Sequence, residues 1–181
     1  ICLDLAQAGL PCRCVVLGDK DLLRRRAALL GKQITLRDFN PHRPSENPIR
    51  QGELEVWHIP LPDVCEAGRL NPANAPYVLQ LLDTACRGVS DGLFAAMVTA
   101  PLHKGVINDG RASSRFFSGH TEYLAEKGGG EQVVMMLAGG GLRVALVTTH
   151  LPLKDVAAAV TQPLIESVGR ILHYDLRTKF G

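Results

Sequence analysis

Residues 13–31, RCVVLGDKDLLRRRAALLG, carry the pattern that decides the fold class. The first six of these residues form a short apolar run of the kind found in buried strands. Asp19 is suited to cap the helix predicted over residues 21–30, and Gly31 is suited to end that helix. A strand followed directly by a helix is the repeating unit of α/β proteins.

The same alternation continues toward the C-terminus. Further strands are predicted at residues 53–59, 132–137 and 142–148, and further helices at 74–87 and 153–175 with a break near Pro163. An apolar run at 93–98 is interpreted as a further strand, so the polar segments 99–105 and 148–152 are both expected at the carboxyl ends of strands. Continuous apolar strands separated by helices predict an α/β fold with a mostly parallel sheet covered by helices on both faces.

The composition is that of a globular chain able to bury a core, since 46% of the 181 residues are hydrophobic and 21% are charged. The net charge of +2 is spread along the chain and indicates neither a nucleic acid nor a membrane surface as partner. No apolar run approaches the roughly 20 residues of a membrane span. The basic run Arg24–Arg26 is expected to form a solvated helix face.

The five cysteines give no disulfide or zinc signature. Their number is odd and no CxxC pair occurs, so they are expected to be reduced structural thiols of a cytoplasmic protein. Cys12 and Cys14 are two residues apart, a spacing that places both side chains on one face of a strand.

His150 is the first candidate for chemistry, because it follows the apolar run 142–148 directly. Functional groups of α/β proteins gather in the loops after the carboxyl ends of strands. A histidine held there is suited to bind a metal or to act as a general base. The alternative is a partly exposed loop histidine, and Pro152 is placed to start the helix that follows.

Two other polar segments have candidate residues. In Gly119–Glu122, glycine allows close backbone approach, and His120 and Thr121 can hydrogen-bond a carboxylate or phosphate; the alternative is a helix start capped by Thr121 or Glu122. In the loop 99–105, Lys104 is suited to attract a phosphate, and His103 to contact a substrate or a metal. The alternative there is a simple connection with a solvated lysine.

Nucleotide-binding motifs are missing from the sequence. No GxGxxG follows a strand, so a Rossmann dinucleotide site is not indicated. The glycine runs at 128–130 and 139–141 lack the Lys-Ser/Thr of a Walker A motif and are predicted to be loops.

Four longer strings identify a resemblance that covers almost the whole chain. They are VTAPLHKGVIN at 98–108, GHTEYL at 119–124, VVMMLA at 133–138 and LRVALVTTHLPL at 142–153. In this order they resemble the 4-hydroxythreonine-4-phosphate dehydrogenases of pyridoxal phosphate biosynthesis. The resemblance implies a fold like that of isocitrate and isopropylmalate dehydrogenases, with two α/β/α domains, a homodimer and active sites in the interdomain cleft. Residues 1–181 then form an incomplete two-domain chain, one domain and part of the second, whose boundary the sequence leaves open.

The resemblance also implies the ligands. His120 and Thr121 match the His-Thr pair that contacts the substrate, and His150 matches the first metal-binding histidine. The other metal histidines and further substrate contacts are expected beyond residue 181. The implied cofactors are NAD or NADP and a divalent metal (zinc, magnesium or cobalt), and the implied location is the cytoplasm.

The reaction implied is NAD-dependent, metal-assisted oxidation of 4-phosphohydroxy-L-threonine. Its β-keto acid product loses carbon dioxide to give 3-amino-2-oxopropyl phosphate. The sequence departs from the family at 109–118, a longer and differently composed segment with two arginines. Two alternatives therefore stay open: a paralogous dehydrogenase of a phosphorylated four-carbon sugar acid, and a non-catalytic member of the same fold.

The chain of residues 1–181 is expected to be inactive alone, because one histidine cannot supply the roughly three protein ligands of a catalytic metal. Both ends also have the pattern of cuts within longer elements, so apolar surface is expected to be exposed. The test is to express these residues and measure NAD reduction with 4-hydroxythreonine 4-phosphate and a divalent metal. Turnover matching that of a full-length homologue would show that the site is misplaced.

Overall fold

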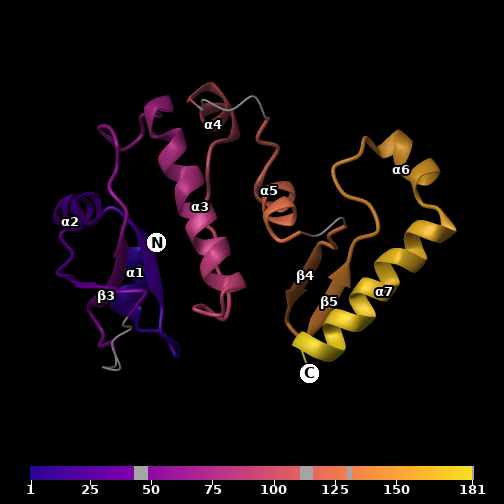
Figure 1. The fold of residues 1–181 in the computed structure, drawn as a ribbon, viewed down its shortest axis with the longest axis horizontal. Helices are drawn as coiled ribbons and strands as arrows, with labels where there is room; N and C mark the ends of the chain where they lie inside the picture. Colours follow the sequence, from indigo (N-terminus) through magenta and orange to yellow (C-terminus); the bar gives the residue numbers. More distant parts are fainter. Residues whose placement is uncertain (43–48, 111–115, 130–131, 181) are drawn as a thin grey trace. The chain divides into compact units, whose positions relative to one another are not determined.

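The computed structural model describes residues 1–42, 49–110, 116–129 and 132–180. The chain divides into two compact units, Ile1–Gly128 and Gly129–Gly181 (Figure 1). The first unit contains the candidate substrate residues, and the second contains His150.

A parallel sheet forms the centre of the first unit. Its strands are β1 (Val15–Gly18), β2 (Thr35–Asp38) and β3 (Glu53–His58), in the order β1-β3-β2. β3 lies in the middle, with Val16 beside Val56 on one side and Leu36 beside Leu54 on the other. The predicted parallel sheet is therefore confirmed for these three strands.

The two faces of this sheet are covered by different sets of side chains. Helices α1 (Cys2–Ala8) and α2 (Lys20–Leu29) pack against the face that carries Leu54 and Val56. On the opposite side of β3, Trp57 meets the rings of Phe39 and Phe94, with centroids 5.7 to 6.2 Å apart. That second side also carries Glu55, whose carboxylate is only 1% exposed and accepts two hydrogen bonds of 2.8 Å from Arg13.

Asp19 caps α2 as predicted. Its carboxylate accepts from the amide of Leu22 at 2.7 Å and from the amide of Leu61 at 3.0 Å, so one side chain fixes both the helix start and the chain after β3. Burial raises the pKa of Asp19, but these amide donors outweigh burial and leave the pKa below its ordinary value.

The remainder of the first unit is helical. A short 3-10 helix, η1 (Pro72–Asn74), leads into α3 (Ala75–Ser90), and α4 (Lys104–Gly110) and α5 (His120–Lys127) follow. A second core, made of Leu82, Ile107 and Phe117, joins these three α-helices. Gly110 makes the closest approach, because a Cβ there would lie 1.7 Å from the carbonyl oxygen of Pro72.

The second unit begins with an antiparallel hairpin. Strands β4 (Met136–Gly139) and β5 (Leu142–Ala145) are joined by Gly140 and Gly141, whose φ angles of 56° and 81° suit a type I′ turn. Leu137, Leu142 and Val144 of this hairpin are exposed.

The hairpin is followed by the helices labelled α6 and α7 in Figure 1. Pro152 is the cap residue of α6 (Leu153–Ala159), and Thr161 caps α7 (Gln162–Lys179) by accepting from the amide of Leu164. The helical prediction for 153–175 is thus confirmed, including its break near Pro163.

The structure corrects two strand predictions. Residues 93–98 form no strand, because Gly92 turns the chain at a φ of 72° and Phe94 packs its ring over Gly88. Val98 is 99% exposed, so this run lacks the burial that a central strand needs. Residues 132–148 supply an antiparallel hairpin in place of two parallel strands, and the glycine turn at 140–141 is the physical reason.

Two consequences follow for the predicted strand ends. The loop 99–105 does not follow a strand, and β5 ends at Ala145, before the polar segment 148–152. Cys12 precedes β1 and is exposed, so the expected strand does not extend to it. In the described part of the chain, no helix is long and apolar enough to span a membrane.

Candidate functional site

His120 and Thr121 are the first two residues of α5, and both are partly exposed. The first amide bonded within this helix is that of Tyr123, which donates to the carbonyl of Gly119 at 3.2 Å. The cap residue is Gly119, which has no side chain to bond the amides before Tyr123. The alternative of a helix start at this segment is thus confirmed, but the cap position is held by Gly119 and not by Thr121 or Glu122.

Gly119 and Lys104 shape the approach to this helix end. Gly119 has φ 156° and ψ −178°, a backbone conformation that glycine adopts and other residues avoid. A Cβ on Gly119 would lie 3.1 Å from Lys104 Nζ and 3.2 Å from a carboxylate oxygen of Glu122. The ammonium of Lys104 is therefore next to the start of α5, where it adds positive charge to the helix dipole.

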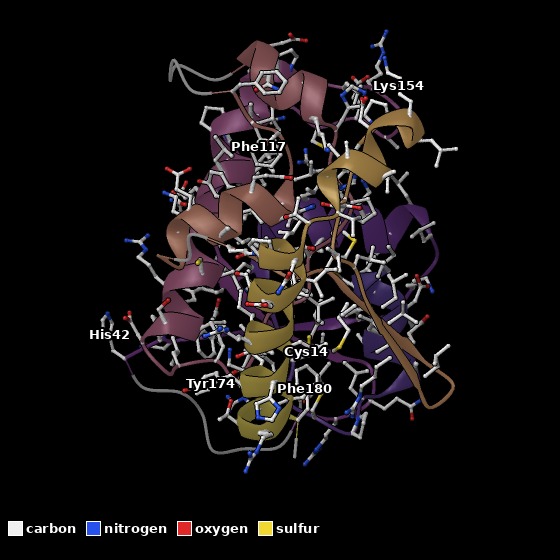
Figure 2. All side chains as sticks on the ribbon, turned by 90° about the vertical axis from the view of Figure 1, so that its right-hand side faces the viewer. Cys14, His42, Phe117, Lys154, Tyr174 and Phe180 are labelled. Atoms are coloured by element: carbon white, nitrogen blue, oxygen red, sulfur yellow. The ribbon has the colours of Figure 1, made fainter. Side chains whose placement is uncertain are left out.

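Asn108 positions this segment from α4. Its side-chain amide donates to the carbonyl of Phe117 at 3.1 Å and accepts from the amide of Phe117 at 2.7 Å. Phe117, labelled in Figure 2, is 2% exposed and belongs to the core beneath. These two hydrogen bonds, called the Asn108 clasp below, fix the backbone of Phe117, two residues before Gly119.

Tyr123 attaches α5 to α3. Its hydroxyl donates to a carboxylate oxygen of Asp83 at 2.7 Å, and Lys127 Nζ lies 2.9 Å from the same oxygen. The Tyr123 ring also packs against Phe117, with centroids 5.4 Å apart. Burial raises the pKa of Tyr123, and its hydrogen bond to Asp83 raises it further, so the hydroxyl stays protonated as a donor.

His103 has a structural contact in the loop before α4. Its Nδ1 accepts from the amide of Val106 at 3.1 Å, in the manner of a helix cap. Because this nitrogen is occupied, only Nε2 is free to meet a ligand. The structure therefore gives Lys104 a place beside His120, whereas it gives His103 a role at the start of α4.

His150 lies in the loop between β5 and α6 and is exposed. Its φ of 59° is the single positive value for a non-glycine residue in the part of the chain that the structure describes. Such a conformation costs free energy and is found at functional sites more often than elsewhere. The imidazole is thus presented to solvent from a strained turn.

The described residues form no cluster of metal ligands. Across 1–42, 49–110, 116–129 and 132–180, no three histidine, cysteine, aspartate or glutamate side chains form a group able to hold a metal ion. His120 and His150 belong to different compact units, and the substrate and metal roles that the resemblance implies for them stay predictions. Residues 111–115 of the atypical segment lie outside the described residues.

Sequence reasoning missed the residues that hold the site in place. Asn108 and Tyr123 were parts of the strings that carry the resemblance, but nothing in their spacing pairs Asn108 with Phe117 or Tyr123 with Asp83. The one available signal was the spacing of Tyr123 and Lys127, which are four residues apart and therefore share a helix face. Both contact Asp83 from that face.

Comparisons with known proteins agree with the geometry. The sequence model of the family described as pyridoxal phosphate biosynthetic protein PdxA matches residues 11–181. The 4-hydroxythreonine-4-phosphate dehydrogenase of Neisseria meningitidis serogroup B is 73% identical over 181 residues, which are 100% of this chain and 54% of that protein. The enzyme of the same name from Chromobacterium violaceum is 55% identical over 179 residues, covering 99% and 52%.

Solved structures give the same result. A crystal structure of 4-hydroxythreonine-4-phosphate dehydrogenase from Klebsiella pneumoniae matches with a TM-score of 0.79 and 29% identity, over 90% of this chain and 49% of that one. The corresponding structure from Burkholderia phymatum matches with a TM-score of 0.76 and 29% identity, over 88% and 47%.

The fold is of the mixed α/β class, with a parallel sheet and helices, and the relatives that match it are named dehydrogenases. Within this class, the chain belongs to the PdxA family of pyridoxal phosphate biosynthesis. It spans about half the length of the curated relatives that it matches.

The Asn108 clasp generates a stability prediction. Replacing Asn108 with Ala leaves the amide and carbonyl of buried Phe117 without their partners, and we expect a loss of about 2 kcal/mol in the free energy of unfolding. Urea denaturation measures this loss. Asn40→Ala is the control, because the Asn40 side chain accepts a hydrogen bond from the amide of His42 in an exposed turn. Losing that hydrogen bond is expected to cost under about 0.5 kcal/mol. Equal effects of the two changes would contradict the clasp.

Proposed function

We propose that the complete protein is a 4-hydroxythreonine-4-phosphate dehydrogenase: an NAD-dependent, metal-assisted enzyme of pyridoxal phosphate biosynthesis. It oxidises 4-phosphohydroxy-L-threonine to a β-keto acid that decarboxylates to 3-amino-2-oxopropyl phosphate. The observation that carries this proposal is 73% identity over the whole chain to a dehydrogenase of that name. A homodimer in the cytoplasm, with an isocitrate dehydrogenase-like arrangement of two domains, is part of the same proposal.

Substrate binding is assigned to the start of α5. The phosphorylated substrate is anionic, and Lys104, the outward amides of α5 and the side chains of His120 and Thr121 offer charge and donors on one small surface. In this proposal Lys104 and the amides balance the negative charge. His120 and Thr121 orient the substrate by hydrogen bonds, and the rigid attachment of α5 keeps them in place.

His150 is proposed as one metal ligand. Its exposed imidazole, presented from a strained turn, has the chemistry of a zinc, cobalt or magnesium ligand, although imidazole favours the first two. The remaining ligands are proposed to come from parts of the complete protein outside the described residues. A bound divalent metal lowers the pKa of the substrate hydroxyl, and NAD or NADP accepts the hydride.

A comparison of substrates tests the reaction. We expect the complete protein, supplied with NAD and a divalent metal, to have a kcat/KM for 4-hydroxythreonine 4-phosphate at least about tenfold above that for a phosphorylated four-carbon sugar acid. Tenfold corresponds to about 1.4 kcal/mol in the transition state. The reverse preference would identify the paralogous dehydrogenase. Turnover of neither substrate would favour a non-catalytic member of the fold.

Histidine variants of the complete protein test the residue roles. We expect His150→Ala to weaken zinc binding at least about tenfold by calorimetry, with little change in the free energy of unfolding, because His150 is exposed. We expect His120→Ala to raise KM about tenfold, because a hydrogen bond to a charged group contributes about 1.5 kcal/mol or more.

The matched control is His173→Ala, which removes an exposed imidazole from α7 and is expected to change neither quantity. His150→Asn is a second control, because asparagine tolerates the positive φ and isolates the loss of the imidazole from the strain. Unchanged zinc affinity in both His150 variants would show that His150 is not a metal ligand.

A further inference from the structure

Three of the five cysteines line a single cavity in the first unit. Cys2, Cys12 and Cys14 open into a space of about 180 Å³ between α1 and the residues that precede β1. The other two lie elsewhere: Cys65 is next to the guanidinium of Arg26, and Cys86 lines a separate surface pocket. The first three thiols therefore form a group that the proposed dehydrogenase chemistry does not use.

Chain topology explains why these thiols meet. Cys14 is two residues before Val16, so the alternation of an extended chain places both on the face of β1 that α1 covers. Cys2 is on α1 and packs, together with Val16, against the core of Ala6, Leu54 and Val56. Helix α1 and the segment before β1 thus bring the thiols of Cys2 and Cys14 to the same cavity. Cys14 is labelled in Figure 2.

Cys14 is the central thiol of the group. It shares the wall of the cavity with Cys2 and Cys12. Burial raises its pKa, and the neighbouring Cys2 and Cys12 raise it further, so Cys14 is protonated and is not the thiol that an oxidant attacks first. Exposure differs among the three, because Cys12 is exposed whereas Cys2 and Cys14 are half-buried. An oxidant arriving from solvent meets Cys12 first.

We propose that Cys2, Cys12 and Cys14 form an oxidation site at which a hydroperoxide converts Cys2 and Cys14 into a disulfide by way of Cys12. The site is a modification site and is independent of the dehydrogenase reaction. In a reducing compartment the disulfide forms transiently, in the manner of redox-sensing cysteines.

The chemistry balances in three steps. The Cys12 thiolate attacks the peroxide oxygen; with hydrogen peroxide, one water leaves and Cys12 becomes a sulfenic acid. The Cys14 thiol attacks the sulfenic sulfur, a second water leaves, and a Cys12–Cys14 disulfide forms. The Cys2 thiol then attacks the Cys14 sulfur, which gives Cys2–Cys14 and returns the Cys12 thiol. In total, two thiols lose two electrons and two protons, and the peroxide gains these electrons and protons as it becomes two waters.

Peptide mapping of the complete protein after dilute hydrogen peroxide and alkylation tests the proposal. The expected product is a peptide pair linked through Cys2 and Cys14, with Cys12, Cys65 and Cys86 alkylated, and dithiothreitol should restore all five thiols. A protein in which Cys2 and Cys14 are both alkylated, while Cys12 alone is oxidised, would overturn the proposal. This arm uses the unmodified sequence and does not depend on the folding of a variant.

A thiol variant identifies the central residue. In Cys14→Ser, the sulfenic acid of Cys12 has no thiol partner, so dimedone is expected to trap it at least about tenfold more than in the parent protein. Cys65→Ser is the matched control, because Cys65 lies outside the cavity, and it should form the Cys2–Cys14 link as the parent does. A Cys2–Cys12 disulfide in the Cys14→Ser protein would contradict the central role of Cys14.

Discussion

The two hydrogen bonds between the Asn108 side chain and the backbone of Phe117 are the constraint on which the candidate site depends. They make the connection into α5 part of the core, because Phe117 is buried. The ring of Phe117, which packs against Tyr123, and the hydrogen bond from Tyr123 to Asp83 then attach α5 to the core and to α3. His120 and Thr121 consequently project from a rigid support, as groups that orient a substrate must.

The sequence predicted the parts of the fold that depend on local signals. Asp19 was recognised as a cap and Pro163 as a break because each acts on its own neighbours. The strand prediction for residues 93–98 was wrong because apolar residues there make tertiary contacts and join no sheet. Phe94, for example, packs its ring over Gly88. The hairpin at 136–145 had a local signal, two central glycines between apolar runs, whose significance for antiparallel pairing was missed.

Some residues of the candidate site could likewise be predicted from the sequence, whereas others required the structure. His120, Thr121 and His150 were selected by residue type and resemblance, and the structure places two of them at a helix start and the third in a strained turn. Lys104 gained importance from the structure, because only the folded chain brings its ammonium to Gly119. The family relation is shown by the sequence model, and the proposed roles of the helix start and of the His150 loop rest on it.

The buried pair of Arg13 and Glu55 has a consequence for how the central sheet finds its alignment. A slip of β3 by one residue would turn Leu54 and Val56 to the wrong face, and hydrophobic burial alone forbids it. A slip by two residues restores the apolar face, so burial cannot exclude that arrangement. It would, however, carry Glu55 away from the Arg13 guanidinium that donates two hydrogen bonds to its buried carboxylate. Electrostatics thus opposes a misalignment that the hydrophobic pattern tolerates.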